Sequence, residues 1–212
     1  MTYREWITNH TEEQGREALC RVLNSENMIL EVLEQRESET ESAVRVSIYI
    51  AFPKADKLEY VIQKATELGA TEIIAFPSAR CVSKPDEKSL KKKLERWQKI
   101  AASAAEQSGR GVIPQVIVLG SYKEALTRAT QTELAILLYE NERATTLKMA
   151  LEAKPLTTVS LISGPEGGLE EREVEQAKNA GIQICTLGRR ILRCETAPLC
   201  ALSAVMYSAG EF

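Results

Sequence analysis

The sequence predicts an α/β domain built on a mainly parallel sheet, with a small β module in front of it. Two observations support this prediction. From Ser47 to the C-terminus, short apolar runs rich in Val and Ile alternate with longer segments in which apolar residues recur at helical spacing. Before Ser47, two apolar runs flank a turn signal, which is the pattern of a β-hairpin.

The predicted hairpin has Ala18–Leu23 and Met28–Leu33 as its strands and Asn24–Asn27 as its turn. One hairpin in about forty residues buries little apolar surface, so this segment is expected to be only part of a small β module. The charged, hydroxyl-rich stretch Glu37–Ser42 is typical of a linker.

We therefore place the N-terminal module in residues 1–43 and the main domain in residues 44–212. Within the main domain, six apolar runs have the length of strands and favour β-branched residues. The predicted strands are Ser47–Phe52, Thr71–Phe76, Gln115–Val118, Glu133–Tyr139, Thr158–Ser163 and Ile182–Leu187.

Helices are predicted between these strands, which makes the sheet mainly parallel. Two of them have long apolar stripes, one with Leu58, Val61 and Ile62 and one with Leu94 and Trp97. In the last predicted helix, Ala197–Ala209, a proline stands near the start, where it is tolerated. The shorter predicted helices are Tyr122–Ala129, Thr145–Ala153 and Leu169–Asn179.

The net charge of −3 by itself argues against binding to nucleic acid. The charge is unevenly spread, however. Met1–Ser42 has four basic and ten acidic residues, a balance of −6, whereas Arg80–Arg110 has nine basic and four acidic residues, a balance of +5. The basic segment is either a surface for RNA or a solvated helix face.

The chain has a single histidine, His10, which excludes most His-based metal sites and nucleophilic triads. We expect no metal, and we expect catalysis to depend on Arg, Glu, Lys, backbone amides or a cofactor. Five cysteines without a Cys-x-x-Cys pair indicate reduced thiols rather than a disulfide framework. The first ten residues have no signal-peptide pattern, and no apolar run is long enough for a membrane span.

Chemistry-bearing residues follow the last three predicted strands. Because parallel strands end at the same edge of a sheet, the three following loops should meet there. The loops contain Tyr139-Glu140, the stretch Gly164–Gly168, and the stretch Leu187–Ala197.

The second loop, Gly164-Pro165-Glu166-Gly167-Gly168, places three glycines where a strand meets a helix. Such a loop can expose bare backbone amides to a ligand, although a tight structural turn is the alternative. It lacks the Gly-x-Gly-x-x-Gly pattern and the Gly-Lys-Ser/Thr ending of phosphate-binding loops. The ligand is therefore expected to be uncharged or cationic rather than a polyphosphate.

The third loop places Arg190 and Arg193 beside Glu195, with Ile191-Leu192 between the arginines. A surface ion pair is one interpretation, and it would contribute little. The other is a half-buried loop whose arginine stabilises negative charge developing on a substrate.

These motifs closely resemble those of the RsmE family, the 16S rRNA (uracil(1498)-N3)-methyltransferases of the SPOUT superfamily. The resemblance rests on Gly164–Gly168 and on Leu187–Leu199, which contains Arg-Ile-Leu-Arg-x-Glu-Thr-Ala-Pro-Leu. It is extended by Lys54–Gly69, by Arg80-Cys81-Val82 and by Glu95–Arg110 with its Glu-Gln-Ser-Gly-Arg ending. It covers the chain from about Ser47 to the C-terminus.

The resemblance implies a deep C-terminal trefoil knot that holds S-adenosylmethionine, dimerisation through the knot region with Ala197–Ala209 as a contact surface, and a PUA-like barrel at the N-terminus. The first 43 residues are short for that barrel, so we expect it to be truncated. Apolar side chains would hold the adenine ring. The implied cofactor-binding residues are Tyr139, Glu140, Ile162, Gly164, Pro165, Glu166, Gly167, Gly168, Leu187, Gly188, Ile191, Leu192, Arg193, Thr196 and Ala197.

The implied reaction is methylation of uracil N3 in the RNA of the small ribosomal subunit, in the cytoplasm. Uracil N3 must lose its proton before it attacks a methyl group, so Arg193 is expected to stabilise the anion and Glu195 or Glu166 to accept the proton. The target base must leave its stack. Candidates for RNA phosphate contacts are Lys54, Lys57, Lys64, Arg80, Lys84, Arg96, Lys99 and Arg110.

Two other functions stay open at this point. One is a different SPOUT RNA methyltransferase, acting on a ribose hydroxyl or another base. The other is a non-catalytic RNA-binding protein that retains the knot.

Overall fold

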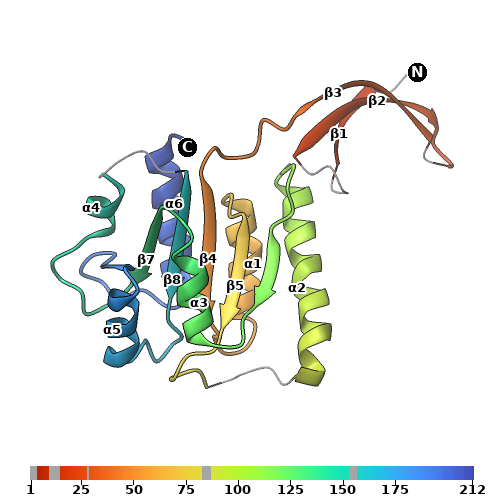
Figure 1. Cartoon of the computed structure of the whole chain (residues 1–212). Helices are drawn as coiled ribbons and strands as arrows, with labels where there is room; N and C mark the ends of the chain where they lie inside the picture. The colour runs from red at the N-terminus through yellow and green to blue at the C-terminus, as the bar shows by residue number, and fades with distance from the viewer. Residues whose placement is uncertain (1–3, 10–14, 28, 83–86, 153–156) are drawn as a thin grey trace.

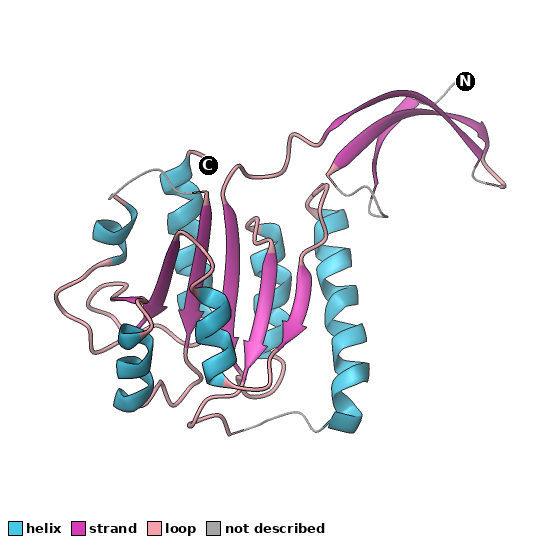
Figure 2. Cartoon of the chain, viewed as in Figure 1, coloured by secondary structure: helices cyan, strands magenta, loops and turns pink. Residues whose placement is uncertain are grey.

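The computed structural model describes residues 4–9, 15–27, 29–82, 87–152 and 157–212. Its main part is a six-stranded sheet with helices on both faces (Figures 1 and 2). The strands follow the order β6-β5-β4-β8-β7-β9, and every neighbouring pair is parallel. The α/β class and the parallel sheet are therefore confirmed.

All six predicted strands are present: two have the predicted bounds, three are shorter at one or both ends, and β4 begins two residues and ends one residue earlier than predicted. Successive side chains point to opposite faces of the sheet, and both faces are buried: in β4, Val46, Ile48 and Ile50 belong to one core cluster, and Tyr49 and Ala51 belong to the other. The strands are β4 (Arg45–Ala51), β5 (Glu72–Phe76), β6 (Gln115–Val118), β7 (Leu134–Leu138), β8 (Thr158–Ser163) and β9 (Gln183–Cys185).

Each face of the sheet is covered by its own set of helices. α1 (Lys57–Glu67), α2 (Glu87–Gln107), α4 (Leu147–Leu151) and α6 (Thr196–Ala209) supply residues to one core cluster. α3 (Tyr122–Ala129) and α5 (Glu171–Asn179) supply residues to the cluster on the opposite face. The predicted helices are present; α4 and α5 each begin two residues later than predicted, and Ala153, the predicted end of α4, lies outside the described residues.

The N-terminal residues form a separate antiparallel sheet of three strands, in the order β1-β2-β3. The predicted hairpin is confirmed by β2 (Arg16–Asn24) and β3 (Ile29–Glu37), which pair with each other. In its turn, the Asn24 side chain accepts backbone hydrogen bonds from Glu26 and Asn27. β1 (Arg4–Asn9) pairs with β2 and was not predicted.

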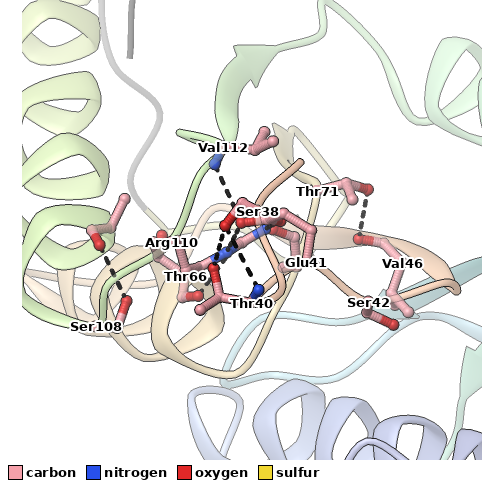
Figure 3. A network of polar contacts seen from close by, with 12 residues as sticks. Ser38, Thr40, Glu41, Ser42, Val46, Thr66, Thr71, Ser108, Arg110 and Val112 are labelled. Atoms are coloured by element: carbon pink, nitrogen blue, oxygen red, sulfur yellow. Dashed lines mark hydrogen bonds and ion pairs between the residues drawn. The ribbon is translucent and has the colours of Figure 1, made fainter. Parts of the chain in front are cut away.

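The segment predicted as a linker is fixed to the main domain by side-chain hydrogen bonds (Figure 3). The Thr40 hydroxyl donates to the Gly109 carbonyl, at 2.9 Å. Glu41 accepts from the Val112 N–H at 3.1 Å and pairs with Arg110. The segment connects β3 to β4, as expected of a linker, and its acidic and hydroxyl side chains are the partners of the loop after α2.

None of the five cysteines, all of which the structure describes, forms a disulfide. Within the described ranges, no group of three or more His, Cys, Asp or Glu side chains could hold a metal ion, and no helix there has the length and apolarity to cross a membrane. His10 lies outside the described residues.

Candidate functional site

The three predicted loops meet at one edge of the sheet and enclose a cavity of about 350 Å³. This volume is within the range of ligand pockets, roughly 300–1,000 Å³. The loops follow β7, β8 and β9, so the expectation that these three loops meet at one edge of the sheet is confirmed. The lining residues are Lys57, Leu138, Tyr139, Glu140, Ser163, Gly164, Pro165, Glu166, Gly168, Leu169, Thr186, Leu187, Gly188, Arg190, Ile191, Leu192, Arg193, Cys194 and Ala197.

The glycine-rich loop after β8 is a tight turn that brings bare backbone to the cavity. The Gly168 N–H donates to the Pro165 carbonyl at 2.9 Å. Gly168 has φ +68°, and a Cβ there would lie 2.6 Å from Glu140 Oε1. A Cβ on Gly164 would lie 3.1 Å from the Leu169 side chain. Gly168 is favoured by its positive φ, and a Cβ there would have to displace the Glu140 side chain, so the structural-turn and ligand interpretations of this loop are compatible.

A buried carboxylate fixes the helix that follows this loop. Glu173, which is 5% exposed, accepts from the Glu170 N–H and from the Ala79 N–H, each at 2.9 Å. The Tyr122 hydroxyl donates to the Glu173 carbonyl at 2.8 Å. Burial first, and the Glu173 charge second, raise the pKa of Tyr122, so its hydroxyl stays a donor. The start of α5 is thereby attached to the loop after β5.

The loop after β9 turns at Gly188, which has φ +110°. The Thr186 hydroxyl accepts from the Gly188 N–H and donates to the Gly188 carbonyl, at 3.2 and 3.1 Å. At the other end of the loop, the Arg193 carbonyl accepts from the N–H groups of Thr196 and Ala197, both at 2.9 Å, and this begins α6. One end of the loop is therefore fixed by the Thr186 side chain and the other end by backbone hydrogen bonds.

The middle of this loop differs from expectation. Ile191 is 81% exposed rather than half buried, although it still lines the cavity. Among the described residues, no ion pair joins Glu195 to Arg190 or to Arg193. Glu195 pairs instead with Lys57, from the first turn of α1. The proposed surface pair within the loop is therefore wrong, and both arginines are left facing the cavity.

Lys57 joins two carboxylates at the cavity wall. Its Nζ lies 3.0 Å from Glu166 Oε1 and 3.2 Å from Glu195 Oε2. Glu166 Oε1 also accepts from the Lys54 N–H at 2.9 Å, and Glu195 Oε2 lies 3.2 Å from the Cys194 Sγ. The side chains of Lys57 and Glu166 are each 26% exposed, and that of Glu195 is 17% exposed.

The protonation states of this cluster follow from its contacts. Burial alone would raise the pKa of Glu166, but hydrogen bonds from the Lys54 N–H and the Lys57 ammonium outweigh it and hold that pKa below its ordinary value. Burial would also raise the pKa of Glu195, but the hydrogen bonds to this carboxylate outweigh it and lower the pKa. The hydrogen bond to Glu166 raises the pKa of Lys57. Burial and the bond to Glu195 raise the pKa of Cys194 to about 12, so it is a neutral thiol.

Most residues predicted to bind a cofactor line the cavity, and three do not. Ile162 is fully buried in the core cluster that contains Leu137 and Ile184, so its predicted contact with an adenine ring is wrong. Gly167 lies outside the cavity, where its carbonyl accepts from Arg80 Nη1 at 2.9 Å. Thr196 is in the first turn of α6 but does not line the cavity. The predicted residues that do line it are Tyr139, Glu140, Gly164, Pro165, Glu166, Gly168, Leu187, Gly188, Ile191, Leu192, Arg193 and Ala197.

Several lining residues were not predicted as pocket residues. Leu138, Ser163 and Thr186 stand at or just after strand ends, and that position was a usable signal. Lys57 was placed on the RNA surface instead, because it is distant in sequence from the other pocket residues. The remaining unpredicted lining residues are Leu169, Arg190 and Cys194.

The predicted RNA-contact residues have different surroundings. Arg110 is 3% exposed and donates to the carbonyls of Thr66 and Ala70, so its predicted phosphate contact is wrong. Lys64 pairs with Glu67 within α1. Lys84 lies outside the described residues. Lys54, Arg80, Arg96 and Lys99 are exposed.

A family model described as an RNA methyltransferase domain matches residues 40–206. The chain is 40% identical to ribosomal RNA small subunit methyltransferase E of Bacillus subtilis, over 92% of this chain and 79% of that protein. It is 35% identical to the protein of the same name from Mesomycoplasma hyopneumoniae, over 82% of this chain and 74% of that protein.

A solved structure shares this fold over nearly the whole chain. It is a ribosomal RNA small subunit methyltransferase E from Neisseria gonorrhoeae bound to S-adenosylmethionine. The TM-score is 0.81 at 35% sequence identity, and the match covers 96% of this chain and 83% of that one.

Proposed function

The chain belongs to the ribosomal RNA small subunit methyltransferase E family, and from this premise we propose that it methylates small-subunit ribosomal RNA with S-adenosylmethionine as the methyl donor. The base we assign is uracil and the acceptor atom is N3, as the motifs from Gly164 to Leu199 imply. The observation that carries the proposal is the cavity that the loops after β7, β8 and β9 enclose.

The residues present fit this methyl donor. Leu138, Leu169, Leu187 and Leu192 give the cavity an apolar wall suited to a flat ring. The turns at Gly164, Gly168 and Gly188 leave backbone groups uncovered by side chains. When bound, the donor supplies an electrophilic methyl group on a sulfonium.

Two kinds of residue would act on the uracil ring. The Arg193 guanidinium lines the cavity, and we assign it to the ring oxygens, where it would favour the deprotonated base. Glu166 and Glu195 are both held ionised, so each is able to accept the N3 proton. Glu195 Oε2 and Glu166 Oε1 are each held by two donors, and the choice between the two residues is left to mutagenesis.

For the RNA chain, we propose phosphate contacts from Lys54, Arg80, Arg96 and Lys99. All four are exposed, and α2 adds further basic side chains next to Arg96 and Lys99. Arg80 has a second contact, because its Nη1 donates to the Gly167 carbonyl at 2.9 Å. Phosphate contacts of this kind fix position rather than sequence.

Larger features of the family are part of the same proposal. We propose that the chain after β9 forms a trefoil knot; in support, Thr186 is hydrogen bonded to the residues before α4, and α6 then covers the centre of the sheet. We further propose a homodimer that uses the exposed side of α6, which includes Cys200 and Tyr207. The three-stranded sheet of residues 4–37 would be part of a PUA-like module within residues 1–43, with residues 44–212 as the catalytic domain in the cytoplasm.

Nucleoside analysis tests the proposed reaction. The protein is incubated with labelled S-adenosylmethionine and unmodified small ribosomal subunits or 16S ribosomal RNA, and the RNA is digested and analysed by mass spectrometry. We expect 3-methyluridine. A ribose-methylated or differently methylated nucleoside would assign a different SPOUT activity, and RNA binding without methyl transfer would assign a non-catalytic RNA-binding role.

A further inference from the structure

Lys57 belongs to the first turn of α1, yet its ammonium group contacts two loops that come more than a hundred residues later in the chain. Glu166 follows β8, and Glu195 precedes α6. The two ion pairs have N···O distances of 3.0 and 3.2 Å. Lys57 therefore links these two walls of the cavity through its two ion pairs.

The backbone before Lys57 is shaped for this contact. The Lys54 N–H and the Lys57 ammonium meet at the same atom, Glu166 Oε1, at 2.9 and 3.0 Å. Ala55 lies between Lys54 and Lys57 and has φ +55°. Among the described residues, every other positive φ belongs to a glycine. This conformation is unfavourable for alanine. A lysine that only faced solvent would not require a strained turn to aim it.

We infer that Lys57 is a positioning residue of the methyl-transfer site: its ammonium group holds the Glu166 and Glu195 carboxylates in place and keeps them together in the cavity wall. The inference rests on the proposed methyltransferase function and deepens it. It also moves Lys57 from the RNA-phosphate surface, where the sequence placed it, into the pocket.

The charges around the cluster explain why a cation is needed there. Two carboxylates within reach of one nitrogen repel each other, and without the cation one of them would take up a proton. The other charged groups that line the cavity are Glu140 after β7 and Arg190 and Arg193 before α6. Among the described residues, neither arginine makes an ion pair with Glu166 or Glu195. Cys194, which contacts Glu195, is a neutral thiol and adds no charge.

The positioning role and a phosphate contact predict different kinetics. If Lys57 bound an RNA phosphate, its loss would raise the KM for RNA and leave kcat nearly unchanged. If Lys57 positions the carboxylates, its loss lowers kcat and leaves the KM for RNA nearly unchanged. It also raises the pH of the acid limb of the kcat profile, because a carboxylate without the ammonium group loses its proton only at higher pH.

The test compares Lys57→Met and Lys57→Arg with wild type in methylation of unmodified small ribosomal subunits. We expect Lys57→Met to lower kcat about tenfold or more, the effect expected of misplaced catalytic groups, and to move the acid limb upward. Lys57→Arg keeps the positive charge, so it should recover most of the wild-type kcat and most of the wild-type position of the acid limb. Lys57→Gln supplies the same measurement if circular dichroism shows that Lys57→Met does not fold.

Lys148→Met is the matched control, since Lys148 also pairs with a glutamate, Glu152, but on α4 outside the cavity. It should leave kcat, both KM values and the pH profile unchanged. A Lys57→Met enzyme with wild-type kcat and a raised KM for RNA would overturn the inference while the proposed function stands. An inactive wild-type protein would overturn the proposed function and this inference together.

Discussion

The Arg110 guanidinium donates to both carboxylate oxygens of Glu41, from Nε to Oε1 at 3.3 Å and from Nη2 to Oε2 at 2.6 Å (Figure 3). The side chains of Arg110 and Glu41 are 4% and 19% exposed. Arg110 Nη1 also donates to the carbonyls of Thr66 and Ala70. One buried side chain thus joins the segment after the N-terminal sheet to the end of α1 and the loop after α2.

Removing Arg110 should be strongly destabilising. In Arg110→Met, Glu41 loses its cation and two carbonyls lose their donor, and breaking a buried pair in this way costs about 3–5 kcal/mol. Urea unfolding followed by circular dichroism measures the change. Arg128→Met is the matched control, because the Arg128–Glu72 pair is partly exposed and should contribute only about 0–1 kcal/mol. Equal losses in the two variants would contradict the structural role given to Arg110.

Replacing Ala55 by glycine should stabilise the protein. The left-handed conformation costs alanine about 1–2 kcal/mol, and glycine gives back about 0.5–1 kcal/mol of this through the entropy of the unfolded chain. The expected net gain in Ala55→Gly is therefore up to about 1 kcal/mol, seen as a higher melting temperature. Ala144→Gly, at an exposed position without positive φ, should instead destabilise slightly. A lower melting temperature for Ala55→Gly would show that the turn is not strained.

Gly168→Ala should weaken binding of the methyl donor. The new Cβ would meet Glu140 Oε1 at 2.6 Å, at a backbone position with φ +68°. Calorimetry should show at least about a tenfold loss of affinity for S-adenosylmethionine, which corresponds to about 1.4 kcal/mol. Gly181→Ala has a similar φ of +84° but nothing within 4 Å of its Cβ. This control should lose stability without losing affinity, and equal affinities in the two variants would contradict the assignment of the cavity.

Arg193→Ala should slow methyl transfer without unfolding the protein. Arg193 is exposed to the cavity, and loss of one group that stabilises developing charge lowers kcat by about a hundredfold or more. Single-turnover methylation of small ribosomal subunits measures the effect. Arg189, in the same loop, does not line the cavity, so Arg189→Ala should be close to wild type. Normal turnover by the Arg193 variant would remove this residue from the proposed mechanism.

The contribution of Glu166 to stability should depend on pH. Its pKa is lowered in the folded protein, so its ionised form stabilises the fold above the unfolded-state pKa of about 4.3. That contribution is lost as pH falls through the folded-state pKa. In urea unfolding, Glu166→Gln should therefore be less stable than wild type at pH 7, and the difference should shrink toward pH 3. A difference that stays constant over this range would show that Glu166 is not held ionised.

The sequence was sufficient to predict the sheet and the place of the site, because both depend on local signals. Strand β4 is an apolar run that is buried on both faces of the sheet, and the three loops follow strand ends that a parallel sheet brings together. Ile162 shows the limit of this reasoning. It stands next to the site in sequence, but its side chain is buried in the core with Leu137 and Ile184 and does not line the cavity.

Charged residues were predicted less well, because their roles depend on partners distant in sequence. Arg110 was predicted to lie on a basic surface, but it is buried and pairs with Glu41, which is 69 residues away in the sequence. Lys57 was predicted to contact a phosphate, but the fold places Glu166 and Glu195 beside its ammonium group. β1 was not predicted, since Arg4–Asn9 is mostly polar and is held by backbone pairing to β2.

Helix α6 has a consequence for how the chain is made. Its buried residues Ala201, Leu202, Val205 and Met206 belong to the same core as Val46 and Ile48 of the central strand β4. The ribosome synthesises them about 150 residues after that strand. Until they emerge, the middle of the sheet has an apolar face open to water, and such surfaces aggregate or recruit chaperones. This core of the nascent protein therefore cannot be completed until α6 has been translated.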